Sequence, residues 1–177
     1  AGYFPVVMII NEAGDWAKGQ ITAETMSRNI AIQPAIVRRP DGSLLMYCRS
    51  RRGAIWRSIS RNDGLSWSIG EATRIPNPDA AVDLLAVGEG TLIMAYNPSA
   101  RDRHRLDIVL SPDAGMTWTS GTSVVSGDGE YSYPSLTLSG DGTVHLVYTE
   151  DRYRVHHVEI ELDELMSARL ETPVHSG

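Results

Sequence analysis

The sequence predicts an all-β protein, a β-propeller of four-stranded antiparallel blades, about three of which are present. A turn motif occurs twice, at residues 60–67 and 111–118, with its serine, Asp or Asn, glycine and tryptophan at the same offsets. Acidic turn residues recur at Asp41, Glu89 and Asp141, with separations of 48 and 52 residues that fit the period of a propeller blade. Segments with a helical pattern are scarce.

Residues 1–30 do not follow this repeat and are interpreted as the remnant of a preceding blade. Residues 4–10 are expected to form a buried strand, and residues 21–26 another short strand. The chain starts without an initiator methionine or a charged segment, which favours a processed or excised segment over a signal peptide.

The repeat predicts three blades and a short tail, because short apolar runs alternate with turns that contain Gly or Pro. The blades are expected over residues 31–79, 80–130 and 131–165, and the tail over residues 166–177. The expected strands are residues 33–38, 44–49, 54–60 and 71–75, then 82–87, 92–96 and 105–110, then 133–138, 144–148 and 155–162. The helix expected at residues 163–170 would have Asp163 as its N-cap.

Composition limits the classes of function. With 177 residues, 42% of them hydrophobic, the chain can bury the core of one domain, and its net charge of −6 argues against a nucleic-acid partner. Only Lys18 among the 16 basic residues is lysine. Arginine grips carboxylates with two parallel hydrogen bonds, although a codon bias also explains such an excess. Cys48 is the single cysteine, which excludes an internal disulfide, and no apolar run is long enough to span a membrane.

The repeated turn motif is suited to closing a β-hairpin, because its short polar side chains can bond their own backbone and its glycine accepts a positive φ. We therefore assign Asp63 and Asp113 to folding. The pattern Ser-x-Asp-x-Gly-x-Thr-Trp is the Asp box, and with it the sequence resembles the sialidase (neuraminidase) superfamily, which has BNR repeats. The resemblance covers residues 31–162 and implies the C-terminal half of a six-bladed propeller.

Equal offsets from the acidic turns place residues at equal positions in their blades. Gln33, Ala81 and Tyr133 each precede the turn acid by eight residues, at the entrance to the first strand of a blade. In a propeller this strand lines the central channel, so we expect the three side chains to face one cavity.

The segment around Tyr133, residues 130–136, resembles the part of sialidases that carries their nucleophilic tyrosine. The resemblance implies that Tyr133 attacks the anomeric carbon, with Tyr131 as the rival tyrosine and a core role as the structural alternative. A phenol suits this reaction, because a carboxylate nucleophile would be repelled by the carboxylate of sialic acid.

Two arginines resemble members of the arginine triad of the family. Arg49 follows Tyr47 and Cys48 at the end of a strand, and Arg105 begins the strand before the second Asp box. The resemblance implies that both bind the substrate carboxylate, and Gln33 is the third candidate substrate-binding residue. Alternatively, each arginine belongs to a solvated surface cluster.

A tyrosine nucleophile needs a neighbouring base, since the pKa of an unperturbed phenol is about 10. The family has a glutamate just before the segment that resembles Gln33-Pro34, but residues 30–32 of this chain contain no acid. Glu130 and Asp83 are the candidate bases in its place. The remaining parts of the family's site lie in its N-terminal half, so this chain alone does not complete the site.

No metal or other cofactor is expected. His156 and His157 are neighbours on a predicted strand, where they point to opposite faces, so they are poor joint metal ligands. Three blades and a remnant also do not close a ring. We therefore expect either a missing N-terminal half or a homodimer that completes the propeller.

The resemblance implies an incomplete sialidase-like exo-glycosidase, a retaining hydrolase of terminal sialic acid on glycoconjugates. The alternatives are a non-catalytic propeller that binds glycans or proteins, and an enzyme acting on another acidic sugar. The expected partner is a sialylated or other acidic glycan, and the resemblance slightly favours a secreted or periplasmic protein.

Overall fold

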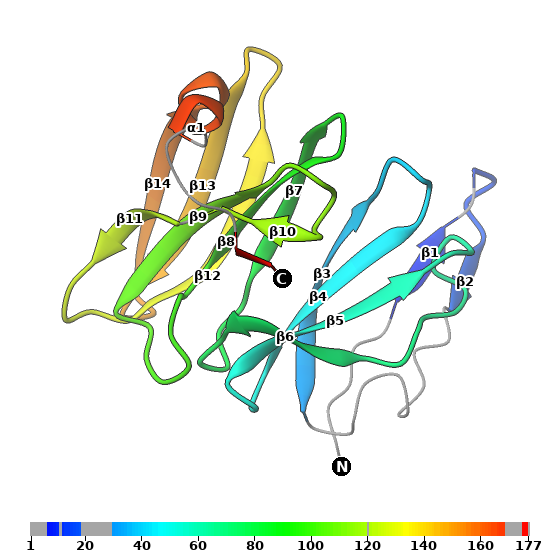
Figure 1. Ribbon diagram of the computed structural model, residues 1–177, viewed down its shortest axis with the longest axis horizontal. Helices are drawn as coiled ribbons and strands as arrows, with labels where there is room; N and C mark the ends of the chain where they lie inside the picture. Colours follow the sequence, from blue (N-terminus) through cyan, green and yellow to red (C-terminus); the bar gives the residue numbers. More distant parts are fainter. Residues whose placement is uncertain (1–6, 11, 19–29, 120, 169–174, 177) are drawn as a thin grey trace.

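The computed structural model describes residues 7–10, 12–18, 30–119, 121–168 and 175–176 (Figure 1). Its first element is an antiparallel hairpin of β1 (Met8–Ile10) and β2 (Trp16–Lys18). Met8 and Ile10 are 51% and 54% exposed, so the expectation of a buried strand here is wrong for these residues. The other strand expected in this region, residues 21–26, lies outside the described residues.

Three antiparallel sheets follow, each formed by strands that are close together in the sequence. The first sheet contains β3 (Ala31–Arg38), β4 (Leu44–Ser50), β5 (Ala54–Ser60) and β6 (Glu71–Pro76), in that order. The second contains β7 (Asp83–Gly88), β8 (Thr91–Tyr96), β9 (Arg105–Ser111) and β11 (Thr122–Ser126). The third contains β12 (Tyr131–Leu138), β13 (Thr143–Glu150) and β14 (Arg154–Glu161).

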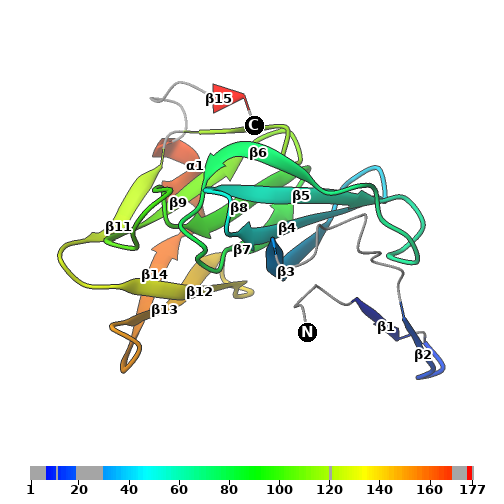
Figure 2. The same ribbon diagram turned by 90° about the horizontal axis from the view of Figure 1, so that it is seen from below.

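The sheets are fanned side by side, and the β1–β2 hairpin lies at the end of the fan away from the third sheet (Figures 1 and 2). The first strand of each sheet is innermost, since β3 contacts β7 and β7 contacts β12. This arrangement confirms the predicted antiparallel blades of a partial propeller. We use "upper edge" for the end of the blades at which β3, β7 and β12 begin, which is drawn at the bottom of Figure 1. Its connections are residues 51–53, 77–82, 97–104, 127–130 and 151–153.

The core lies between neighbouring blades. Leu92 and Met94 of β8 pack toward the first sheet, while Ile93 and Ala95 pack toward the third. All four are almost fully buried, which explains why β8 is a continuous apolar run rather than an alternating one.

The second Asp box fastens the first two blades together at the opposite edge. Ser111 Oγ accepts a hydrogen bond from the Gly115 amide at 2.8 Å, and Asp113 Oδ1 accepts one from the Thr117 amide at 2.8 Å. The indole of Trp118 is buried and donates to the hydroxyl of Tyr47 at 3.2 Å. Its strand β10 (Thr117–Trp118) pairs with β15 (His175–Ser176).

The described part of the chain contains one helix, α1 (Leu162–Ala168). Asp163 lies within its first turn rather than at the N-cap, because the helix begins one residue earlier than expected. No helix among the described residues is long and apolar enough to span a membrane.

Candidate active site

Two backbone bulges occupy equivalent positions at the upper edge. The pairing of β3 with β4 shifts between Ile32 and Pro34, and the bulged residue Gln33 has a φ of 51°. A matching shift occurs in β12, where Tyr133 has a φ of 54°. A positive φ is costly for a side chain of this size, and the following proline in both cases restricts the backbone further. Such strain is concentrated at functional sites.

The bulge turns Tyr133 outward. Its side chain is 40% exposed, whereas Tyr131 is 7% exposed and packs edge-on against Tyr148 with ring centroids 6.2 Å apart. Gln33 is also exposed, but Ala81 lies in the connection before β7 and not in a strand. Gln33 and Tyr133, which have equal offsets from their acidic turns, therefore occupy equivalent backbone positions in their blades.

Arg49 lies at the upper end of β4 with its side chain 14% exposed. Its Nε is 3.2 Å from Oδ1 of Asp79, an ion pair without hydrogen-bond geometry, since neither atom has a hydrogen-bond partner among the described residues. Arg51 Nε lies 3.4 Å from the other carboxylate oxygen of Asp79. Asp79 thus sits between two guanidinium groups, and its φ of 56° is again positive.

Arg103 connects this cluster with the third blade. Its Nη2 donates to the carbonyl oxygen of Asp79 at 2.6 Å, and its Nη1 donates to Glu130 Oε1 at 2.9 Å and to Ser132 Oγ at 3.1 Å. The side chain is 15% exposed, as buried as that of Arg49. The two arginines therefore meet through one residue, Asp79.

Glu130 is held as a carboxylate by several donors. Its Oε1 accepts hydrogen bonds from Arg152 Nε and from Ser132 Oγ, both at 2.9 Å, besides that from Arg103. The hydrogen bond from Arg152, followed by that from Ser132 and the charge of Arg103, lowers the pKa of Glu130 despite some burial. The same hydrogen bond raises the pKa of Arg152, and the nearby phenol of Tyr133 adds to this rise. Arg152 consequently places a positive charge near that phenol.

Asp83, the other candidate base, ties two innermost strands together. Its Oδ1 accepts from the Leu84 amide at 2.9 Å, and its Oδ2 accepts from the Leu136 amide of β12 at 2.7 Å. Burial raises the pKa of Asp83, and these two hydrogen bonds oppose the rise. Both oxygens are thus occupied by backbone donors.

Arg105 lies apart from this network. Its Nε donates to Asp107 Oδ1 at 2.6 Å, and this hydrogen bond raises the pKa of Arg105, whose side chain is 49% exposed. It lines a separate pocket together with Tyr96, Pro98, Ser99, Asp102, Asp107, Thr119 and Gly121. The expectation that Arg105 converges with Arg49 and Tyr133 stays a prediction.

Sequence reasoning missed Arg103, Asp79 and Arg152. Arg103 is one of three arginines within residues 101–105, and nothing in the sequence shows that its side chain is more buried than those of Arg101 and Arg105. Asp79 and Arg152 lie in connections, where offsets measured from the turns do not fix the position of a side chain.

The BNR repeat-like domain matches residues 6–146. The chain belongs to the BNR repeat-like domain family. No curated protein matches the sequence. Membership agrees with the two Asp boxes, which recur between the third and fourth strands of the first two blades of this BNR domain.

Solved sialidases share the fold. The NanB sialidase from Streptococcus pneumoniae superimposes with a TM-score of 0.72 at 18% identity, over 90% of this chain and 28% of that one. The leech intramolecular trans-sialidase gives 0.71 at 19% identity, over 91% and 28%. Trypanosoma rangeli sialidase, in complex with 2,3-difluorosialic acid as a covalent intermediate, gives 0.65 at 14% identity, over 93% and 28%. This BNR domain thus has a sialidase-like fold and spans less than a third of the length of these proteins.

Proposed function

We propose that the chain supplies part of the active site of a sialidase-like exo-glycosidase that releases terminal sialic acid with retention of configuration. The observation that carries the proposal is Tyr133, an exposed phenol on a strained bulge of an innermost strand, near Arg152, whose Nε donates to Glu130. Sialidases use a tyrosine as their nucleophile, and an exposed phenol is accessible to a sugar.

In the proposed reaction, Tyr133 Oη gives its proton to a base, for which Glu130 and Asp83 are the candidates, and forms a bond to the anomeric carbon while the bond to the leaving oxygen breaks. That oxygen takes up a proton from an acid supplied by another part of the propeller. Water then gives a proton to the conjugate base of that acid and attacks the same carbon, and the displaced tyrosine oxygen regains its proton from the first base, so two inversions give net retention.

The substrate carboxylate is proposed to bind to Arg49 and Arg103. Both guanidinium groups are largely buried, and both contact Asp79. Partial burial strengthens charge-assisted hydrogen bonds, and a paired guanidinium site orients a planar carboxylate. Arg105 would have to leave Asp107 to join them, and Gln33 would contribute its amide from the equivalent bulge.

The surroundings of the two candidate bases favour a second candidate function, a non-catalytic glycan-binding propeller. The lowered pKa of Glu130 makes it a poor proton acceptor, and both oxygens of Asp83 already accept backbone hydrogen bonds. Two largely buried arginines, without a free base at either candidate position among the described residues, can bind an acidic sugar without cleaving it.

The rest of the propeller is proposed to come either from further residues of a longer chain or from a second copy of this one. The mass in solution distinguishes these sources, since a dimer of about twice 19.4 kDa indicates completion by a second copy. Activity is then measured on the form that has a complete propeller, which is either the longer chain or the dimer.

The proposal is tested with Tyr133→Phe, with the exposed Tyr153→Phe as matched control. We expect Tyr133→Phe to lower kcat for release of sialic acid from sialyllactose by about 10³-fold or more with little change in binding, and Tyr153→Phe to be neutral. Full activity of Tyr133→Phe would refute the nucleophile. Binding of sialosides without any release by the wild type would favour the second function, and preference for uronates would indicate another acidic sugar.

A further inference from the structure

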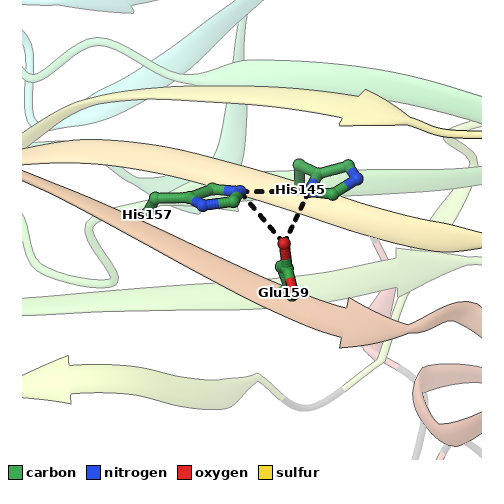
Figure 3. Close-up of side chains that lie close together, drawn as sticks. All are labelled: His145, His157 and Glu159. Carbon is green, nitrogen blue, oxygen red and sulfur yellow. Dashed lines mark hydrogen bonds and ion pairs between the residues drawn. The ribbon is translucent and has the colours of Figure 1, made fainter.

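A cluster of two histidines and a glutamate lies on the third blade, outside the network at the upper edge. On β13 the side chains of Val144, Leu146 and Tyr148 are buried in the core, so the side chains between them project from the opposite face of the sheet. His145 is on that face, directly opposite Glu159 of β14. His157 lies two residues before Glu159 and therefore shares its face (Figure 3).

The three side chains converge on a common point. His145 Nδ1 lies 3.0 Å from His157 Nε2, and the planes of the two rings are inclined by only 17°. Glu159 Oε1 is 3.7 Å from His145 Nδ1 and 4.0 Å from His157 Nε2. All three ligand atoms are within 4.8 Å of one another (Figure 3).

These distances fit a tetrahedral metal ion. With metal–nitrogen and metal–oxygen bonds of about 2.0–2.2 Å, two ligand atoms of a tetrahedral site are separated by about 3.3 Å. The distances of 3.0, 3.7 and 4.0 Å bracket that value, so shifts of a few tenths of an ångström would suffice. The side chain of His157 is 48% exposed and that of Glu159 is 65% exposed, which leaves both free to make them.

The ligand types define the class of ion. Two imidazoles and one carboxylate suit Zn²⁺ and related divalent transition metals, whereas Ca²⁺ and Mg²⁺ prefer sites made of oxygen alone. Three protein ligands leave a fourth position for water or for a group of another molecule. The carboxylate also offsets part of the charge of the ion.

We propose that His145, His157 and Glu159 bind a divalent transition-metal ion of the Zn²⁺ type. The bound ion fastens β13 to β14, the last two strands of the third sheet. The sequence did not indicate this site, because the histidine that pairs with His157 lies on the neighbouring strand. The adjacent His156 points to the opposite face of the sheet, where its Nε2 lies 3.0 Å from Oε2 of Glu150.

The test is calorimetric titration of the 177-residue chain with ZnCl₂, with His157→Asn and Glu159→Gln as site variants. His156→Asn is the matched control, since it removes the neighbouring imidazole from the opposite face. We expect one ion per chain, an affinity at least about 10-fold lower in both site variants, and no change in the control. Circular dichroism checks that each variant is folded.

A second measurement reads the geometry directly. Co²⁺ added in place of Zn²⁺ should give the visible absorption of a tetrahedral ion, and the band should be lost in His145→Asn. Absence of stoichiometric Zn²⁺ binding to the wild type would overturn the proposal and leave a hydrogen-bonded histidine pair. Equal weakening by His156→Asn and His157→Asn would also overturn it, because binding would then be unspecific.

Discussion

Arg103 and Glu130 are joined at 2.9 Å, Nη1 to Oε1, across two connections at the upper edge of the blades. The same guanidinium group donates to the carbonyl oxygen of Asp79. Arg103 therefore links the connection between the first two blades, residues 77–82, to the beginning of the third blade. The site therefore depends on contacts between blades, and not on one blade alone.

Removal of this arginine should weaken both the fold and the binding of acidic glycans. In Arg103→Gln, the carbonyl of Asp79 and the carboxylate of Glu130 lose donors, and we expect a loss of about 1–3 kcal/mol in the free energy of unfolding. Sialoside affinity should fall with it. Urea denaturation and titration calorimetry measure the two effects. Arg101→Gln, at an exposed position, is the control, and an equal effect there would contradict the assignment.

The lowered pKa of Glu130 predicts a dependence of stability on pH. A carboxyl group whose pKa is lower in the folded than in the unfolded protein stabilises the fold above its ordinary pKa of 4.5. This stabilisation is lost as the pH falls through the lower, folded value. The melting temperature of Glu130→Gln should therefore be below that of the wild type at about pH 7, and the difference should shrink in acid.

The corresponding control is Glu164→Gln, at an exposed position of α1. Its melting temperature should follow that of the wild type across the same pH range. A difference between the wild type and Glu130→Gln that stays constant down to acid pH would show that the charge of Glu130 is not what stabilises the network.

The second Asp box predicts a large cost for a small substitution. Gly115 has a φ of 87°, and a Cβ atom there would lie 2.6 Å from Cδ2 of the buried Leu45. We expect Gly115→Ala to destabilise the protein by about 1–3 kcal/mol, measured by thermal unfolding. Gly140→Ala, where a Cβ atom meets nothing within 4 Å, should be nearly neutral. Similar melting temperatures for the two variants would contradict the packing described for the box.

Most strands were predictable from the sequence because the repeat supplies its own reference points. The strand expected at residues 54–60 is β5 to the residue, and the offset rule placed Gln33 and Tyr133 at equivalent positions. The offsets could not predict the backbone conformation of these two residues. Both adopt a positive φ because an extra residue is inserted into the strand pairing at each position.

Contacts between blades could not be derived from the sequence. Arg103 is useful to the site only because the carbonyl of Asp79 and the carboxylate of Glu130 arrive from two different connections. Likewise, His145 and His157 are brought together by the register of β13 against β14, which no local pattern specifies.

The most direct test of the account is covalent labelling of the protein in its closed-ring form with 2,3-difluorosialic acid, followed by peptide mass spectrometry. We predict one adduct per site, on the peptide that contains Tyr133, and none in Tyr133→Phe. An adduct on Tyr131 or on a carboxylate, or hydrolysis of sialosides by a protein that never acquires an adduct, would contradict the central claim that Tyr133 is the nucleophile.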